Sequence, residues 1–457
     1  MDLEVFTTDG LGDATYLIAS DGEAALVDPQ RDAWRFLAVA ERRGWRVSRV
    51  LETHVHNDYV SGAHEVRAAT GATIVVPARG GYTFAHEPAD EGDEVRLGDL
   101  RLVAMATPGH TPEHLAWAVA GVTEDAPLAV FSGGSLLVGS SGRTDLLGAE
   151  RVDELTAAQH STLRRLAALP DATTILPTHG AGSFCSAGPA ADAPPPTTIG
   201  AERLANAAFT APSLAAFEVA ALGSLGRFPD YYAHIAPINR AGAPVLGRLP
   251  APALLDAAAV EAAVAVGARI VDARDRKAFA AAHIAGSLNI ELTSPFAAYV
   301  GWLLPYDSPV VLVSGSPIDL EEALVQLFRI GWSRVVGSLD GGIDAWQAAG
   351  RPVRSYPTTR LRDLEAEVVA GKQPRILDVR QPVEWRETGI VPGSSTIFVA
   401  DLPKRLEPLR GTSAVTVVCK SGQRSAIAAS ILDGAGIPVR LVAEGGVPDW
   451  SVTPAGS

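Results

Sequence analysis

The chain has 457 residues, a length that predicts two to four domains. With 47% hydrophobic and 20% charged residues, it has the composition of a folded globular protein rather than a disordered one. The net charge of −14 argues against nucleic acid or an anionic membrane surface as a partner. Two cysteines cannot form a disulfide framework, so we expect a reducing, cytoplasmic location. Neither a signal peptide nor a membrane-spanning apolar run is expected.

The first 180 residues alternate short apolar runs with turn signals, which predicts a mixed α/β domain. Strands are expected at residues 14–18, 24–27, 47–51, 72–76, 100–104 and 128–131, and helices at 33–43, 63–70 and 154–169. A proline-containing loop at 186–198 should interrupt helix formation, followed by a helix at 202–220 and an irregular connector at 228–249. In that connector, Asn239 and Arg240 are expected to fix the front domain against the middle one.

The remaining chain contains two copies of one βα pattern. Residues 270–274 match 376–380, and residues 310–314 match 415–419, at a nearly constant spacing. A Gly-Gly pair followed by a tryptophan also recurs in each copy. Ordered matches at one spacing indicate an internal duplication. We therefore expect four segments, which are a front domain (1–185), a helical extension and connector (186–252), a middle domain (253–356) and a C-terminal domain (357–457).

The front domain holds most of the histidines, and several of them follow predicted strands. His54, His56 and Asp58 lie just after the strand at 47–51, His110 lies in a turn, and His179 follows a later strand. Imidazole and carboxylate ligands at the ends of separate strands are typical of an open catalytic metal site. We therefore predict a metal site in this domain.

The motifs T-H-V-H-N-D-Y at 53–59, T-P-G-H at 107–110 and F-S-G-G at 131–134 resemble the metallo-β-lactamase superfamily. That family carries H-x-H-x-D-H, P-G-H-T and F-[ST]-G-D. The resemblance is to its persulfide dioxygenase branch, including forms fused to rhodanese domains. It implies an αββα sandwich with a mononuclear ferrous iron held by two histidines and an aspartate. His54 and His110 match the two histidines.

Two positions depart from the family pattern. Gly134 stands where the family has the aspartate ligand, and Tyr59 replaces the last histidine of the first motif. The loss of an anionic ligand weakens the binding of a divalent ion, so the metal is expected to be weakly held or absent. His56, Asp58 and His179 remain candidates to complete the site. Restoring the carboxylate with Gly134→Asp is expected to strengthen metal binding.

The C-terminal domain places a cysteine between a strand and a helix. The apolar run 415–418 precedes Cys419, and a helix is expected from about residue 426. A thiol below the amides of a helix start is stabilised as a thiolate, and the same amides can hold a persulfide anion. Arg424 adds a permanent cation. The other expected substrate-binding residues of this loop are Lys420, Ser421, Gly422, Gln423 and Ser425.

This loop resembles the active loop of the rhodanese family of sulfurtransferases, C-x-x-x-x-R-[ST]. The resemblance implies a doubly wound α/β domain in which Cys419 is the nucleophile that accepts a sulfane sulfur, with Arg424 in the catalytic loop. In the middle copy, Ser314 stands at the cysteine position and Asp319 at the arginine position. A hydroxyl cannot form a persulfide, so the middle domain is expected to be catalytically silent and to act as a scaffold.

The favoured function is an enzyme of persulfide metabolism. It would combine sulfur transfer through Cys419 with a persulfide dioxygenase-like front domain that acts on a low-molecular-weight persulfide such as glutathione persulfide. One alternative is a sulfurtransferase only, with a metal-depleted front domain as a binding module. The other is a zinc thioester hydrolase like glyoxalase II, which would need the residues lost at 59 and 134. Expected partners are a small persulfide, thiosulfate or a thiol, and a homo-oligomer is expected.

Overall fold

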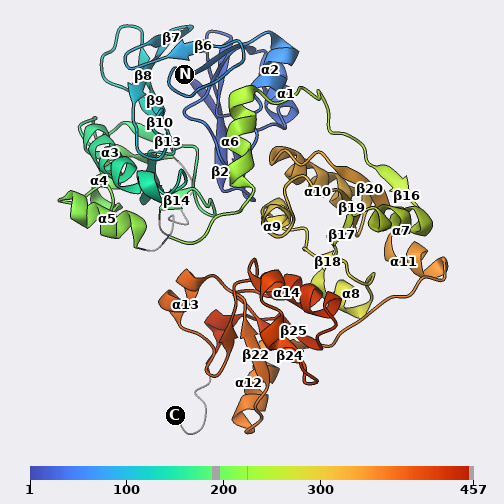
Figure 1. The fold of residues 1–457 in the computed structure, drawn as a ribbon. Helices are drawn as coiled ribbons and strands as arrows, with labels where there is room; N and C mark the ends of the chain where they lie inside the picture. Colours follow the sequence, from blue (N-terminus) through green and yellow to red (C-terminus); the bar gives the residue numbers. More distant parts are fainter. Residues whose placement is uncertain (188–195, 224, 452–457) are drawn as a thin grey trace. The chain divides into compact units, whose positions relative to one another are not determined.

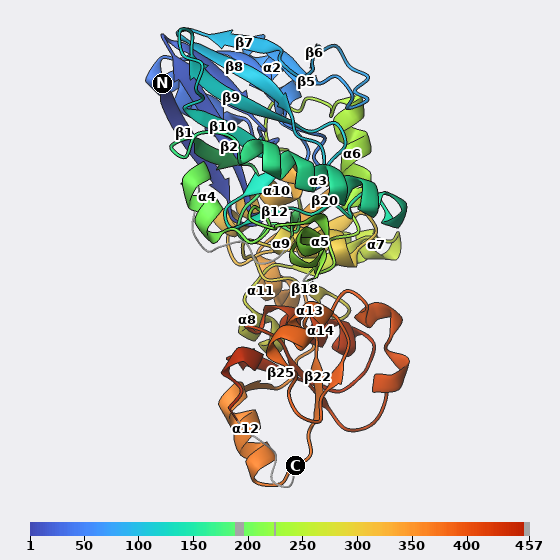
Figure 2. The same cartoon turned by 90° about the vertical axis from the view of Figure 1, so that its left-hand side faces the viewer.

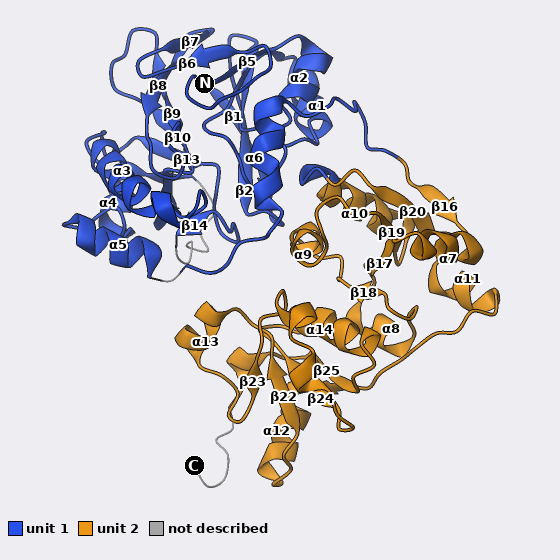
Figure 3. Cartoon of the chain, viewed as in Figure 1, with its two compact units in different colours: residues 1–250, 328–331 blue, residues 251–327, 332–457 orange. Residues whose placement is uncertain are grey.

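The computed structural model describes residues 1–187, 196–223 and 225–451. The chain divides into two compact units (Figure 3). Unit 1 contains residues 1–250 and 328–331, and unit 2 contains residues 251–327 and 332–457. The proline-rich stretch that the sequence predicts as a loop lies largely at 188–195, outside the described residues.

Unit 1 is built on two six-stranded sheets. The first has the order β1-β2-β3-β4-β5-β6 and the bounds Asp2–Thr8, Asp13–Ser20, Glu23–Val27, Arg46–Leu51, Thr73–Pro77 and Glu87–Ala89. The second has the order β15-β13-β10-β9-β8-β7 and the bounds Thr197–Thr198, Thr174–Pro177, Ala129–Gly133, Leu115–Gly121, Leu100–Ala106 and Glu94–Leu97. A small third sheet contains β11 (Leu136–Leu137), β12 (Ser140–Gly142) and β14 (Ser186–Ala187).

Helices cover the outer faces of these sheets. Figure 1 shows α1 (Trp34–Arg43) and α2 (Ala63–Thr70) on one side, and α3 (Val152–Leu166), α4 (Ile199–Ala205) and α5 (Leu214–Leu222) on the other. Figure 2 views the unit from the side of α3. One apolar core, which includes Tyr16, Trp117 and Phe131, fills the space between the sheets. Separate cores lie under α1 and α2 and under α3 to α5. The predicted αββα sandwich is confirmed.

The helical prediction at 202–220 is wrong as a single helix. The chain forms α4 and α5 with an irregular segment between them. The side chain of Asn206 accepts hydrogen bonds from the backbone amides of Ala208 and Phe209, which competes with helical pairing. Pro212 cannot donate to a preceding turn, and Ser213 caps the next helix by accepting from Ala216 N–H.

The predicted connector at 228–249 contains a helix, α6 (Tyr232–Ala241), despite Pro237 inside it. The amide of Asn239 accepts from Ser61 N–H at 2.9 Å and donates to the carbonyl oxygens of His56 and Tyr59. Asn239 therefore fixes the loop after β4 within unit 1, while its predicted role against the middle domain stays a prediction. Arg240 also bonds inside unit 1, where its Nε donates to Gly80 O.

Unit 2 contains two parallel five-stranded sheets of the same strand order. The middle domain has the order β16-β20-β19-β17-β18, with bounds Ala253–Leu255, Val335–Leu339, Val310–Val313, Arg269–Asp272 and Leu288–Asn289. The C-terminal domain has the order β21-β25-β24-β22-β23, with bounds Thr358–Arg360, Val439–Glu444, Val415–Val418, Arg375–Asp378 and Ser395–Thr396. The shared topology agrees with the predicted duplication.

The helices of the middle domain are α7 (Ala257–Ala265), α8 (Arg276–Ala281), α9 (Phe296–Leu303), α10 (Pro317–Arg329) and α11 (Gly342–Ala348). Those of the C-terminal domain are α12 (Leu361–Val369), α13 (Pro382–Thr388) and α14 (Gln423–Gly434). In the described part of the chain, no helix combines the length and hydropathy needed to cross a bilayer.

The matching residues after β22 and β17 form the same kind of ion pair in the two domains of unit 2. Arg380 lies against Asp378 with Nη2 at 2.6 Å from Oδ2, and Arg274 makes the same pair with Asp272. The pair in the C-terminal domain is buried, the one in the middle domain is partly buried, and they fix the loops that follow β22 and β17. A further contact joins the two domains. Burial alone would raise the pKa of Asp433, but hydrogen bonds from His283 and Arg354 lower it to about 2.

Candidate functional site

The loops at one end of the two sheets of unit 1 bring the predicted metal-ligating residues together. His54, His56 and Asp58 lie in the loop after β4, His110 lies between β8 and β9, and His179 follows β13. All five side chains are buried. The sequence-predicted residues therefore form one polar cluster, although they come from distant parts of the chain.

Three of these residues form one of the groups that could hold a metal ion. His54, His110 and His179 each offer one ring nitrogen, and these atoms all lie within 4.8 Å of one another. Nε2 of His54 lies 3.2 Å from Nε2 of His179. Burial lowers the pKa of His54 and His110 well below the usual range, so both rings are neutral, the form that binds a metal. These three residues are called the histidine cluster below.

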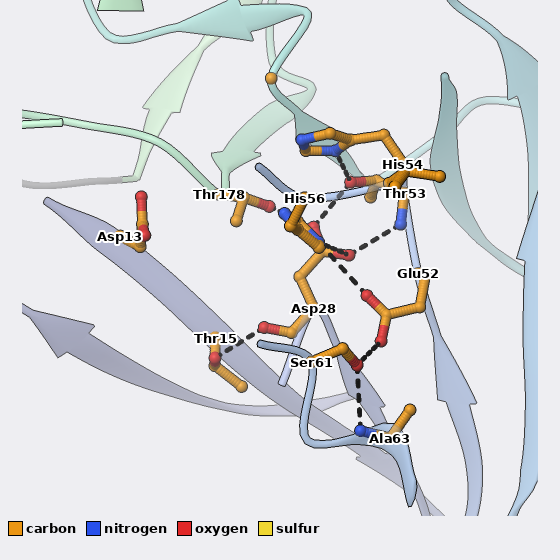
Figure 4. Close-up of polar contacts among 12 residues, drawn as sticks. Asp13, Thr15, Asp28, Glu52, Thr53, His54, His56, Ser61, Ala63 and Thr178 are labelled. Atoms are coloured by element: carbon orange, nitrogen blue, oxygen red, sulfur yellow. Dashed lines mark hydrogen bonds and ion pairs between the residues drawn. The ribbon is translucent and has the colours of Figure 1, made fainter. Parts of the chain in front are cut away.

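His56 takes part in a polar network that also reaches His54 through Asp28 and Thr53 (Figure 4). Its Nε2 lies 3.3 Å from Oδ1 of Asp28, 3.2 Å from Oε2 of Glu52 and 3.0 Å from the Tyr59 hydroxyl. Burial opposes the charge of the ring, but the two carboxylates outweigh it and raise the pKa of His56 well above its usual range. His56 is thus an imidazolium paired with carboxylates, and Tyr59 supports this pairing through its hydroxyl.

Asp58 lies against the outer side of His179. Its Oδ2 is 3.4 Å from His179 Nδ1, while Oδ1 of Asp13 is closer at 2.7 Å. Burial raises the pKa of Asp13 to about 8 and that of Asp58 to about 7, so the pair retains a proton in the metal-free protein. Bound divalent charge would favour release of that proton.

Gly134 leaves no room for the carboxylate that the family pattern has there. The His110 ring lies against the backbone of both Gly134 and Gly142. A Cβ atom at residue 134 would lie 2.8 Å from His110 Nε2 and closer still to Cδ2. The Gly134 N–H also donates to Nε2 of His114 at 2.9 Å. The expectation that an aspartate at 134 would simply add a ligand does not fit this packing.

The sequence reasoning missed the carboxylates that orient the histidines, which are Asp13, Asp28 and Glu52. Asp28 accepts from the Thr53 backbone N–H and hydroxyl, both at 2.7 Å, and its backbone is left-handed with φ 49°. The sequence did contain a signal for two of these carboxylates, because Asp28 follows the end of β3 and Glu52 follows the end of β4. Both strands are parallel neighbours, so their ends meet at the same edge.

The second site lies in the C-terminal domain, on residues 419–425, called the persulfide loop below. Cys419 directly follows β24, and α14 begins at Gln423. The Gly422 N–H donates to the Cys419 sulfur at 3.1 Å, and the left-handed backbone of Gly422 (φ 92°) aims that amide at the sulfur. Cys419 is 2% exposed. The predicted arrangement of a strand, a cysteine loop and a helix start is present.

Arg424 does not act as an isolated cation. Its guanidinium forms a two-point ion pair with Glu384 on α13, with Nη2 2.8 Å from Oε1. Burial acts against the charge, but the pair with Glu384 raises the pKa of Arg424 and lowers that of Glu384. Ser425 is fully buried, and its hydroxyl has no hydrogen-bond partner among the described residues.

The middle domain contacts the persulfide loop directly. Nη1 of Arg276, at the start of α8, donates to Ser421 O at 2.6 Å, and the same guanidinium lies over Gly422. The Gln423 amide donates to the Thr293 hydroxyl. Tyr299 on α9 is close enough to Cys419 and Arg424 for their charges to act on it, and burial raises its pKa to about 12. The middle domain thus does more than support the fold.

The middle domain's own loop has no comparable chemistry. Ser314 follows β19, and Asp319 on α10 accepts from the Ser316 hydroxyl at 2.8 Å while its backbone N–H donates to the same oxygen. Asp319 therefore stabilises the helix start in place of a cation.

Arg276→Ala tests whether the middle domain holds the persulfide loop in its working shape. We expect the sulfur transfer predicted from the sequence to slow about tenfold, because a charged hydrogen bond to the loop contributes about 1.5–3 kcal/mol. Steady-state assays should show the loss in kcat. Lys277→Ala is the matched control, since its ammonium pairs with Glu444 on the surface and should matter little. Equal rates in both variants and wild type would show that the loop needs no support from the middle domain.

Together, the fold and its two sites define a fusion of a metallo-β-lactamase-type domain with two rhodanese-like domains. The model of the metallo-beta-lactamase superfamily matches residues 9–179. The model of the rhodanese-like domain matches residues 255–349 and 361–453. The chain therefore belongs to the metallo-β-lactamase superfamily through its front domain and carries tandem rhodanese-like domains behind it.

Several individual proteins are similar to this chain. Hydroxyacylglutathione hydrolase from Cereibacter sphaeroides is 37% identical over 187 residues, covering 39% of this chain and 67% of that enzyme. The crystal structure of a metallo-beta-lactamase from Staphylococcus aureus subsp. aureus COL has a TM-score of 0.66 at 28% identity. It covers 74% of this chain and 98% of that one. ETHE1 from Myxococcus xanthus has a TM-score of 0.45 at 28% identity, covering 54% of this chain and 100% of that one.

Proposed function

We propose that the chain is a sulfurtransferase that carries sulfane sulfur as a persulfide on Cys419. The observation that carries the proposal is the hydrogen bond from Gly422 N–H to the Cys419 sulfur, 3.1 Å long, at the start of α14. A backbone amide and a helix N-terminus stabilise negative charge on sulfur. A persulfide anion has the same need, so the loop suits both states of the carrier.

The transfer needs two displacement steps. The Cys419 thiolate attacks the outer sulfur of thiosulfate, the S–S bond of thiosulfate breaks, and sulfite leaves with the bonding electron pair. An acceptor thiolate then attacks the outer sulfur of the Cys419 persulfide, and the Cys419 thiolate leaves. The acceptor is oxidised to its persulfide and Cys419 is restored. Both steps keep the charge close to the Gly422 amide.

We further propose that the front domain acts on a low-molecular-weight persulfide such as glutathione persulfide. With O₂ and water, glutathione persulfide would yield glutathione and sulfite, and a ferrous ion at the histidine cluster would supply the O₂ chemistry. The buried histidine cluster supports this, as does likeness to an enzyme whose name specifies a glutathione conjugate. Sulfite from this reaction would be a substrate for the reverse of the thiosulfate step at Cys419.

A thioester hydrolase is the second candidate, and the 37% identity to hydroxyacylglutathione hydrolase favours it. Two observations weigh against it. Tyr59, at the position of a family histidine, bonds to His56 and to the Asp28 carbonyl, and His110 occupies the space beside Gly134. A two-metal site would need ligands at both positions. A sulfurtransferase with a metal-free front domain is the remaining alternative.

One set of assays on the full chain separates these functions. We expect sulfur transfer from thiosulfate to glutathione without added metal. After anaerobic addition of Fe²⁺, we expect O₂ uptake and sulfite release with glutathione persulfide. Absence of O₂ uptake at confirmed metal occupancy would leave the sulfurtransferase-only alternative, and hydrolysis of lactoylglutathione with Zn²⁺ would favour the hydrolase. Absence of sulfur transfer would remove the proposal for Cys419.

A further inference from the structure

A groove with a volume of about 580 Å³ lies between the two domains of unit 2. The middle domain lines it with the starts of β17 and β18 and the end of α9. The C-terminal domain lines it with the end of α14 and the segment around Pro403. Sites for small organic molecules typically have volumes of about 300–1,000 Å³, so the groove is large enough to hold such a ligand.

The groove is separate from the persulfide loop, although both include part of α14. Helix α14 begins at Gln423 in that loop, whereas the groove is lined by Ile431, Gly434 and Ala435 at the other end of the helix. At a rise of about 1.5 Å per residue, the 12 residues of α14 separate its ends by about 18 Å. None of the described residues that line the groove belongs to the persulfide loop. A ligand in the groove would therefore not occupy the sulfur-transfer site.

The walls of the groove are mainly apolar. Leu288, Leu303 and Leu304 line it from the middle domain, and Leu406 and Ile431 line it from the C-terminal domain. Part of this apolar surface stays in contact with water. Removing such surface from water is favourable, so the walls favour a ligand with an apolar body that contacts both domains.

One charged side chain lines the groove. Arg269, at the start of β17, is exposed, and its guanidinium has no ion pair or hydrogen bond with the described residues. The described lining contains no Asp or Glu side chain. The Ser430 hydroxyl is already used, since it donates to Ile427 O at 2.7 Å and accepts from Asn289 N–H at 3.1 Å. One available cation beside apolar walls is complementary to an organic anion.

We propose that this groove binds an organic anion in which one carboxylate is joined to an apolar chain, such as a medium-chain fatty acid. The carboxylate pairs with the Arg269 guanidinium, whose planar fork of donors matches two carboxylate oxygens. The chain lies against the leucine side chains of both domains and removes them from water. The inference depends neither on sulfur transfer at Cys419 nor on a metal in the front domain.

Calorimetric titration of the full chain with decanoate tests the proposal. We expect one saturable site per chain. Acetate, which lacks the apolar chain, and decyltrimethylammonium, which carries the opposite charge, should each bind at least about tenfold more weakly. Decanoate should also raise the unfolding midpoint of unit 2, because a ligand that binds only the folded state stabilises it. Absence of saturable decanoate binding, or equal binding of the cation, would overturn the proposal.

Three variants locate the site. Arg269→Gln should weaken decanoate binding about tenfold, because it removes the charge from an ionic hydrogen bond. Ala435→Trp should weaken binding at least about tenfold, because the indole ring takes up part of the groove. Arg334→Gln is the matched control, since Arg334 is exposed just before β20 and is not among the lining residues. Wild-type affinity in both Arg269→Gln and Ala435→Trp would mean that the anion binds elsewhere.

A second measurement needs no variant and so does not depend on the folding of a mutant. A decanoate analogue with a photoreactive diazirine at the end of its chain should label the wild-type chain within residues 303–305, 403–406 or 430–435, which line the groove. Mass spectrometry identifies the labelled peptides, and excess decanoate should suppress the labelling. Labelling confined to other segments would overturn the assignment of the site.

Discussion

Replacing the carrier sulfur with oxygen is expected to abolish sulfur transfer. In Cys419→Ser, thiosulfate-to-thiol transfer should fall by at least about 10³-fold, because a hydroxyl cannot form or release a persulfide. The fold should persist, since the change is small and the side chain is buried at the end of β24. Activity is measured by sulfite release from thiosulfate, with thermal unfolding recorded for both proteins.

Cys185 provides the matched control. It is the other cysteine of the chain, buried in unit 1 with its sulfur 3.9 Å from the Tyr232 hydroxyl. Burial raises its pKa well above the usual range, so it stays a thiol. Cys185→Ser should keep the full transfer rate. Mass spectrometry after thiosulfate treatment should find one added sulfur atom in wild type and in Cys185→Ser. An added sulfur in Cys419→Ser would mean that the carrier is elsewhere.

Patterns that are local in sequence predicted most of the fold. The strands at 47–51 and 100–104 were found because apolar runs bounded by turn residues specify buried strands. Helix α2 matched its predicted bounds, as Ala63, Val66 and their neighbours bury one face and Gly71 ends it. Helix α6 was missed, because Pro237 normally interrupts a helix. Here its neighbours Tyr232 and Ile235 are buried, and Asn239 anchors the far end.

In the candidate site, too, some features could be predicted from the sequence and others could not. His54, His110 and His179 were predicted as members of one site because each follows a strand or occupies a turn. Their partners could not be inferred so easily, since Asp13 pairs with a residue 166 positions away. Nor does the sequence show that the His110 ring fills the space beside Gly134, because this depends on how β10 and the turn before β9 pack. That packing leads to the opposite expectation for the effect of Gly134→Asp on metal binding.

Gly134→Asp is expected to weaken metal binding rather than strengthen it. The new Cβ would overlap the ring of His110, which cannot retreat easily. Nδ1 of the His110 ring is hydrogen-bonded to the Arg143 carbonyl oxygen, and the His110 backbone N–H donates to the Gln159 side chain. The backbone of Gly142 also lies against this ring. Overpacking of this kind costs about 1–3 kcal/mol, which corresponds to about 2–10 °C in the unfolding midpoint of a unit this size.

Gly134→Ala separates the steric effect of the added Cβ from the effect of the added carboxylate. Alanine adds the same Cβ without a carboxylate, so both variants should lose thermal stability and displace His110. If displacement alone governs binding, the Co²⁺ affinity of both should fall together. The unfolding midpoint of unit 1 and the Co²⁺ titration measure the two quantities separately. Stronger Co²⁺ binding in Gly134→Asp than in wild type would contradict the prediction, because His110 would then have moved to admit a carboxylate ligand.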